Sequence, residues 1–160
     1  MSHVTTIATE IRDLQALRDA CKALGVEWRE GQREYAWYGK HAGDYPIPDG
    51  MTKEQLGHCD HAIRVPGVRY EIGVVKTATG YTLAYDFYGN LHCDFYRRDN
   101  GENINRHDGG LLRQRFGDGL GKLVQAYGVQ KTIREALRAG MHARQQVQAD
   151  GSIRVVLTQR

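Results

Sequence analysis

The sequence predicts a single α+β domain over residues 1–160, in which an antiparallel β-sheet carries two principal helices packed on one face. Three observations support this fold class. A β-branched opening segment leads into an amphipathic helix, three alternating segments separated by turns occupy the middle, and the last third has helical spacing before a closing hairpin. A chain of 160 residues is expected to bury roughly two-thirds of the surface that its unfolded form exposes, which suits one core.

The first third predicts a strand followed by a helix. Residues 3–11 are rich in β-branched side chains and indicate the strand. Asp13 is placed to cap a helix, and Gly25 is placed to end it. The apolar residues between them recur at helical spacing: Leu14, Leu17, Cys21 and Leu24. Two short strands are predicted after this helix, at residues 26–30 and 34–39.

The middle of the chain predicts a three-stranded antiparallel meander. Its strands are expected at 61–67, 69–77 and 81–89, because Pro66-Gly67 and the segment "TATG" supply turns between them. Alternation along the first of these strands places His61, Ile63 and Val65 on one face.

The last third predicts one long helix, or two, followed by a hairpin. Glycines 117, 119, 121 and 128 fall within the helical pattern, and each is expected to cost about 1 kcal/mol relative to alanine inside a helix. Asp150-Gly151 then fits a primed two-residue turn between two final strands. The apolar residues that set the helical spacing are Leu112, Phe116, Leu120, Leu123, Val124, Tyr127, Ile133 and Leu137.

Composition restricts the compartment and the partners. The three cysteines are too few for a disulfide framework and favour a reducing compartment, so we expect a soluble, cytoplasmic protein. No stretch approaches the roughly 20 apolar residues that span a bilayer, and we expect no membrane partner. The net charge of +3 is mild and scattered, which does not indicate nucleic acid.

Four segments together resemble a family of conserved hypothetical proteins. They are "MSHVTTIATEIRDLQALRDACKALG", "AIRVPGVRYEIGVV", "YTLAYDFYG" and "DGSIRVVL". The family is encoded in plastid and cyanobacterial genomes, in other bacteria and in bacteriophages, and is classed as a domain of unknown function. The resemblance brings no activity or catalytic residue set with it. The chain looks longer than the compact family pattern near 39–58 and 97–110, so we expect a specialised role in these two loop insertions.

Aromatic and basic residues gather around both insertions and suggest a site for an anionic ligand. Aromatic faces stack on bases, and Arg or Lys binds phosphate. The same alternation of aromatic residues is also what an ordinary half-buried strand shows. The candidate ligand-binding residues are Arg33, Tyr38, Lys40, His41, Tyr88, Tyr96, Arg97 and Arg98.

The leading functional hypothesis is a non-enzymatic protein that binds a small phosphorylated or nucleotide-like ligand. If the gene is viral, as the family's distribution allows, such a protein could sequester a host signalling nucleotide. The alternative is a protein–protein interaction or adaptor module that docks through the sheet, with Trp28 and Trp37 as anchors. Homo-oligomerisation stays open under either hypothesis.

A third hypothesis is a zinc-binding protein or a metal-dependent enzyme. Zinc commonly takes four Cys or His ligands, and His58, Cys59, His61 and Cys93 are the candidates, with His92 beside them. Neighbouring residues on a strand point to opposite faces, which argues against the set. Cys59 also has histidines on both sides, as a nucleophilic thiol would need, but it lacks a recognisable catalytic context. We therefore expect no resident cofactor.

Overall fold

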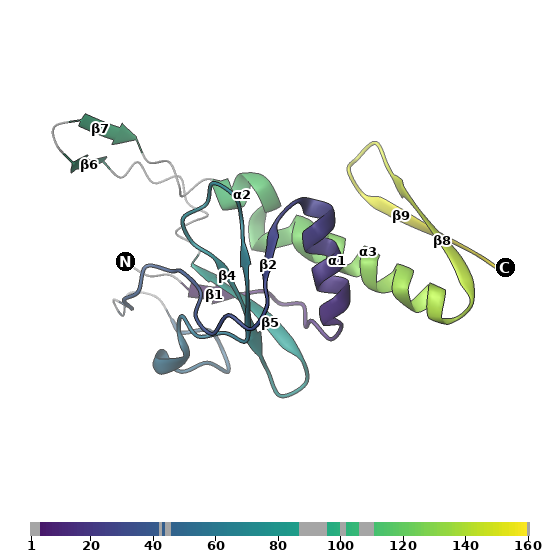
Figure 1. The fold of residues 1–160 in the computed structure, drawn as a ribbon, viewed down its shortest axis with the longest axis horizontal. Helices are drawn as coiled ribbons and strands as arrows, with labels where there is room; N and C mark the ends of the chain where they lie inside the picture. Colours follow the sequence, from purple (N-terminus) through teal and green to yellow (C-terminus); the bar gives the residue numbers. More distant parts are fainter. Residues whose placement is uncertain are drawn as a thin grey trace.

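The computed structural model describes residues 4–41, 43, 46–86, 96–99, 102–105 and 111–159. Among these, five strands form one antiparallel sheet in the order β1-β5-β4-β3-β2 (Figure 1). The predicted α+β class, a sheet with two principal helices, is confirmed. The strands are β1 Val4–Thr6, β2 Glu27–Arg29, β3 His61–Arg64, β4 Ile72–Lys76 and β5 Tyr81–Asp86.

Helix α1, Leu14–Leu24, joins the two edge strands β1 and β2. Asp13 caps it by accepting a hydrogen bond from the Ala16 amide at 2.9 Å. Gly25 ends it in the left-handed conformation at φ 67°, which a residue with a β-carbon rarely adopts. The predicted N-cap at Asp13 and the predicted end of the helix at Gly25 are therefore confirmed. Both can be predicted from sequence because capping depends only on residues that are close in the chain.

The central meander is also confirmed. Strand β4 pairs with β3 on one side and with β5 on the other, both antiparallel. The turn between β3 and β4 closes through a hydrogen bond from the Val68 amide to the Val65 carbonyl at 3.1 Å. Gly67 occupies the position of positive φ, at 80°, that follows the proline in this kind of turn.

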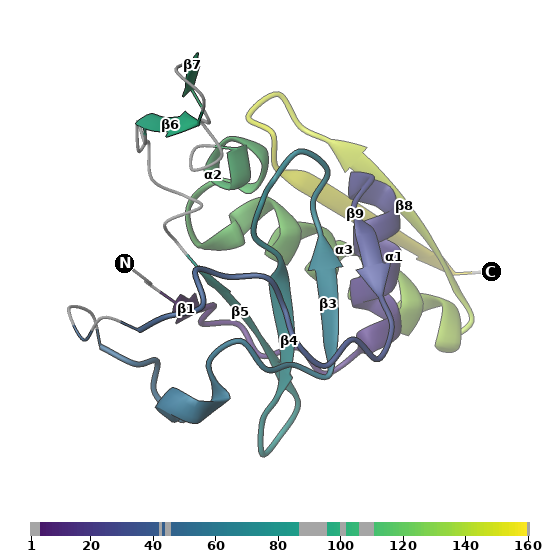
Figure 2. The same ribbon diagram turned by 60° about the vertical axis from the view of Figure 1, so that its left-hand side comes forward.

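The C-terminal helical segment is interrupted, as its glycines allowed. Helix α2, Leu111–Phe116, is followed by a short 3₁₀ turn η3, Asp118–Leu120, and then by α3, Gly121–Arg138. The break lies at Gly117 and Gly119, both at positive φ. Helices α1 and α3 pack against each other on one side of the sheet (Figure 2). The fully buried core residues on this side include Leu17 of α1, Phe116 of α2, Leu120 of η3 and Leu123 of α3.

The opposite face of the sheet is covered by the chain between β2 and β3. Ala62, Gly73 and Ala84 lie side by side across three strands on this face, and Tyr35 is buried against them. The strand predicted at 34–39 is wrong: the structure has only an isolated bridge between Glu34 and His58 there. The alternating aromatic residues of that segment cover the sheet instead of joining it. The predicted loop that follows contains one 3₁₀ turn, η1, Lys53–Gln55.

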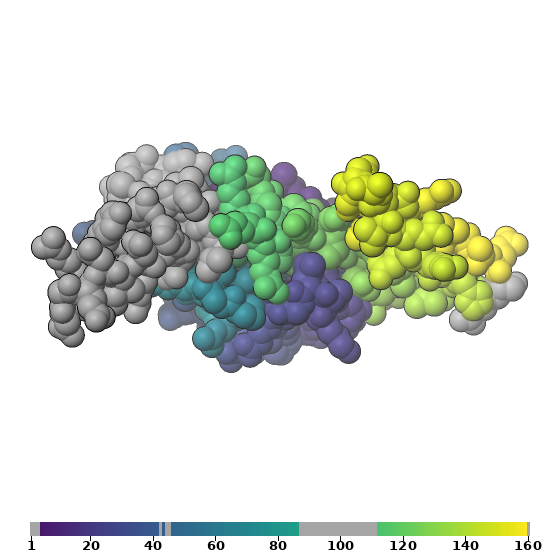
Figure 3. Space-filling view, turned by 90° about the horizontal axis from the view of Figure 1, so that it is seen from above, coloured from purple at the N-terminus to yellow at the C-terminus, as the bar shows by residue number. Residues whose placement is uncertain are grey.

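Two further hairpins stand apart from this sheet. Strands β6, Tyr96–Asp99, and β7, Glu102–Asn105, pair with each other. Strands β8, Met141–Val147, and β9, Ile153–Gln159, form the predicted C-terminal hairpin, which packs on α3 and forms one end of the molecule (Figure 3). The predicted primed two-residue turn is wrong. The strands are joined by a longer turn over Gln148–Ser152, in which the Gly151 amide donates a hydrogen bond to the Gln148 carbonyl.

Candidate functional site

The first set of predicted ligand residues lies in the loop that covers the sheet. The Arg33 guanidinium is paired with the Asp60 carboxylate at 3.3 Å. Tyr38 is an exposed side chain, and its amide donates a hydrogen bond to the buried carboxylate of Asp86 at 3.2 Å. Lys40 is exposed and His41 is half-buried. These residues share a loop, but neither of the two cavities described below includes them.

The second set lies largely beyond what the structure describes. Tyr88 is outside the described residues. Tyr96, Arg97 and Arg98 lie on β6, where Arg97 pairs with Ile104 in the backbone register. The two halves of the predicted ligand site therefore stay a sequence-based hypothesis, since no described contact joins them.

The predicted metal ligands that lie within the described residues are in three different environments. His58 is exposed, with Nδ1 3.8 Å from the Glu34 carboxylate. Cys59 is buried beneath the covering loop, and its thiol donates to the Gln32 carbonyl at 3.2 Å. His61 lies on the helix-bearing face, and Cys93 is outside the described residues. Within the described part of the chain, no group of three or more His, Cys, Asp or Glu side chains is placed to hold a metal ion.

The environment of Cys59 also opposes a nucleophilic role. Burial, together with the nearby carboxylates of Asp60 and Glu71, raises the pKa of the Cys59 thiol to about 12. A catalytic cysteine needs a lowered pKa so that the thiolate is present near neutral pH. The thiol is therefore protonated and serves as a small buried side chain.

His61 belongs instead to a polar and aromatic cluster at the edge of the sheet. Its Nδ1 accepts the Gly31 amide at 3.0 Å, and its ring lies 5.0 Å from that of Trp28. The Glu30 carboxylate accepts hydrogen bonds from Trp28 Nε1 and from Arg18, both at 2.6 Å. The bond from Trp28 is the main reason that the pKa of Glu30 lies below its ordinary value. Because these contacts join residues of α1, the β2 segment and β3, the cluster fixes β2 against α1 and β3.

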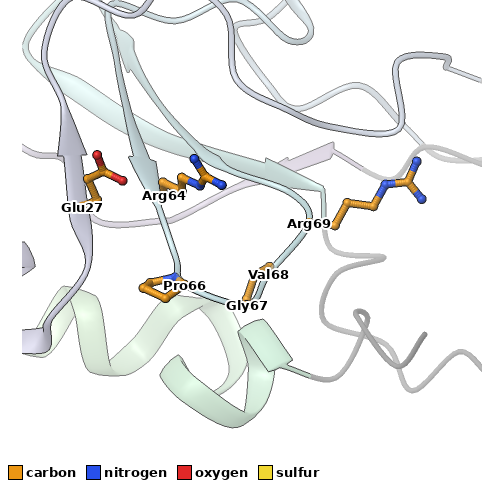
Figure 4. A pocket seen from close by; sticks show the side chains of 6 residues that line it. All are labelled: Glu27, Arg64, Pro66, Gly67, Val68 and Arg69. Carbon is orange, nitrogen blue, oxygen red and sulfur yellow. The ribbon is translucent and has the colours of Figure 1, made fainter. Parts of the chain in front are cut away.

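A basic cavity lies at the turn between β3 and β4 (Figure 4). Arg64 comes from the end of β3, Arg69 follows the turn, and Glu27 comes from β2, where it is the cross-strand partner of Arg64. The open cavity has a volume of about 410 Å³, within the range of roughly 300–1,000 Å³ that small-molecule sites occupy. Pro66, Gly67 and Val68 form its floor at the turn.

The two arginines of this cavity have no acidic partner among the described residues. No described carboxylate lies within 4 Å of either guanidinium, although Arg69 lies 5.7 Å over the ring of Tyr70. Glu27, the only acidic side chain among the described residues that line the cavity, is paired with Arg29 at 3.1 Å. The amides of Gly67 and Arg69 also donate to no other described residue. The cavity is thus lined by two cations that no described carboxylate neutralises.

A second basic cavity offers a direct comparison. It lies between the start of α1 and α3 and has a volume of about 400 Å³. There, each cation has an acidic partner. Its three pairs are Arg12 with Glu10 at 2.7 Å, Lys131 with Glu135 at 3.9 Å, and Arg138 with Asp13 at 4.0 Å. Because every cation of this cavity already has an acidic partner, the cavity at the β3–β4 turn is the stronger candidate for an anion.

Sequence reasoning missed Arg64 and Arg69. The signal is present in "RVPGVR", where two arginines flank a Pro-Gly turn symmetrically, but a Pro-Gly turn by itself predicts only a reversal of the chain. Glu27 could not have been added from the sequence, because only the pairing of β2 with β3 brings it there.

The described chain contains no helix that is both long and apolar enough to cross a membrane. Comparisons with family models, with curated proteins and with solved structures find no match to the chain.

Proposed function

We propose that the protein is a non-enzymatic binding protein for a small anionic ligand of the phosphorylated or nucleotide-like class, and that the ligand binds at the β3–β4 turn. The observation that carries the proposal is the pair Arg64 and Arg69, two guanidinium groups that line one cavity without a described acidic partner. Guanidinium groups bind phosphate oxygens through paired, charge-assisted hydrogen bonds.

The remaining groups of the cavity suit the rest of such a ligand. The Glu27 carboxylate can accept a hydrogen bond from a hydroxyl or amino group, such as a sugar or a base carries. Pro66 and Val68 supply apolar surface on which a ring can rest. A ligand with an anionic end and a neutral, hydrogen-bonding end therefore complements the cavity better than a simple inorganic anion does.

Calorimetric titration with three probes tests the proposal. Adenosine 5′-monophosphate should bind, inorganic phosphate should bind more weakly, and adenosine, which lacks the anion, should not bind measurably. Affinity should fall as salt is added, because both arginines are solvent-exposed.

Two variants locate the site. Each charge-assisted hydrogen bond contributes about 1.5–3 kcal/mol, so Arg64→Gln or Arg69→Gln should weaken binding by about tenfold or more. The matched control is the double variant Arg12→Gln/Arg138→Gln in the cavity between α1 and α3, which should bind normally. Equal loss in the control, or no binding of any phosphate-containing probe, would refute the proposal.

A further inference from the structure

The C-terminal hairpin is attached to the rest of the described chain mainly through α3. A two-stranded hairpin is marginally stable alone, so packing on α3 must stabilise it. This packing leaves apolar side chains in solvent: Val147 is 76% exposed, Leu157 41% and Leu137 49%. Figure 1 shows the hairpin at the end of α3, beyond the main sheet. Both long edges of the hairpin lack a neighbouring strand among the described residues.

The outer edge of β9 presents a defined set of hydrogen-bonding groups. The Gln148 amide donates a hydrogen bond to the Ser152 carbonyl, so the backbone groups of this residue pair point toward the partner strand. In an antiparallel pair, every second residue pair along the strands has its backbone groups in the same direction. The backbone groups of Arg154, Val156 and Thr158 therefore point toward β8. The backbone groups of the alternate residues point away from β8: Ile153, Val155, Leu157 and Gln159.

The geometry points to pairing of β9 with β9 of a second copy of this chain, antiparallel about a two-fold axis at Val156, to give a four-stranded sheet. This register overlaps all seven residues of the strand and places each outward residue opposite another outward residue. Val155 then faces Leu157 of the second copy, and Arg154 faces Thr158. The interface is isologous, as closed dimers require, and it covers the exposed Leu157.

Charge explains why β9, rather than β8, is the pairing edge. The equivalent full-length register for β8 is centred on Arg144 and would place Arg144 directly opposite Arg144 of the second copy. Like charges directly opposite each other destabilise an antiparallel pair. The same central position of β9 holds Val156, a β-branched apolar residue that favours strand pairing.

Two proline variants on one rung test the pairing by sedimentation equilibrium. Val155 and Gln145 are cross-strand partners, and both amides point outward, so proline at either position removes no bond between β8 and β9. The wild-type protein and Gln145→Pro should sediment at twice the mass of one chain, and Val155→Pro at the mass of one chain. A monomeric wild-type protein, or a dimer lost only in Gln145→Pro, would overturn the inference.

Cysteine cross-linking tests the register without weakening the hairpin. A two-fold axis at Val156 brings the two α-carbons of that residue to about 4.5 Å, within reach of a disulfide. Val156→Cys should form a covalent dimer under mild oxidation, whereas Arg144→Cys, its partner on the same rung, should remain monomeric on a non-reducing gel. Cross-linking through position 144 instead, or through neither position, contradicts the proposed register.

Discussion

The ring of Tyr35 lies directly on the backbone of Gly73. A β-carbon added at Gly73 would lie 2.3 Å from Tyr35 Cδ1, so the Tyr35 ring or the strand would have to shift. Ala62 and Ala84 flank this glycine on the adjacent strands, and both are fully buried. The row of small residues thus forms a shallow seat for one aromatic ring, which holds the covering loop on the sheet. Burial raises the pKa of Tyr35 to about 12, so its hydroxyl is neutral at physiological pH.

Replacement of Gly73 by alanine should therefore destabilise the protein. We expect Gly73→Ala to lower the free energy of unfolding by about 1–3 kcal/mol, as overpacking typically does, measured by urea denaturation. The control is Gly128→Ala in α3, where an added β-carbon meets nothing within 4 Å. That variant should be more stable by up to about 1 kcal/mol, because alanine favours the helix. Equal stability of Gly73→Ala and the wild type would show that Tyr35 is not seated there.

The buried thiols should be unreactive in the folded protein. Burial raises the pKa of Cys21 and of Cys59 to about 12, so almost no thiolate is present at neutral pH. Mass spectrometry after brief treatment with iodoacetamide should find both residues unmodified in buffer and both modified in guanidinium chloride. Rapid labelling of Cys59 in buffer would contradict this account and would revive a nucleophilic role.

Asp13 should contribute to stability through two separable interactions. Its carboxylate caps α1 at Ala16 and also pairs with Arg134 of α3 at 3.2 Å. Asp13→Ala removes both and should cost about 1–3 kcal/mol, whereas Asp13→Asn keeps the cap acceptor and should cost less. Urea denaturation at neutral pH measures both variants. An asparagine variant as unstable as the alanine variant would assign the whole effect to the ion pair.

The same carboxylate predicts a dependence of stability on pH. Burial opposes ionisation of Asp13, but the Ala16 amide and Arg134 outweigh it, so the pKa lies below its ordinary value. A lowered folded-state pKa means that the stabilisation is complete above the unfolded-state pKa of about 3.9 and is lost as the pH falls through the folded-state value. Stability should therefore decline in acid more steeply for the wild type than for Asp13→Asn.

The cluster around Glu30 offers a local optical readout. The hydrogen bond from Trp28 lowers the pKa of Glu30, so the midpoint of its protonation should lie below the ordinary glutamate value of about 4.3. In a Trp37→Phe background, the fluorescence of Trp28 should change with a midpoint below that value. Glu30→Gln should abolish this transition. A midpoint above the ordinary value would mean that the Trp28–Glu30 bond does not persist in solution.

The parts of the fold that were predictable from sequence depend on neighbours in the chain. Asp13 and Gly25 bound α1 because capping is local, and Pro66-Gly67 sets the β3–β4 turn for the same reason. The strand predicted at 34–39 is wrong because alternating aromatic residues also suit a loop that covers a row of small residues. The two arginines of the basic cavity lie in one local segment, whereas Glu27 joins them only through the pairing of β2 with β3, which local patterns do not encode.

The most direct test of anion binding at the β3–β4 turn is a titration of the ¹⁵N-labelled protein with adenosine 5′-monophosphate, followed by amide chemical shifts. The account predicts saturable shifts at Gly67, Val68 and Arg69, with smaller shifts at Glu27, and none of these in the Arg64→Gln/Arg69→Gln variant. Shifts confined to the loop that bears Arg33, Tyr38 and Lys40, or to the cavity between α1 and α3, would contradict it.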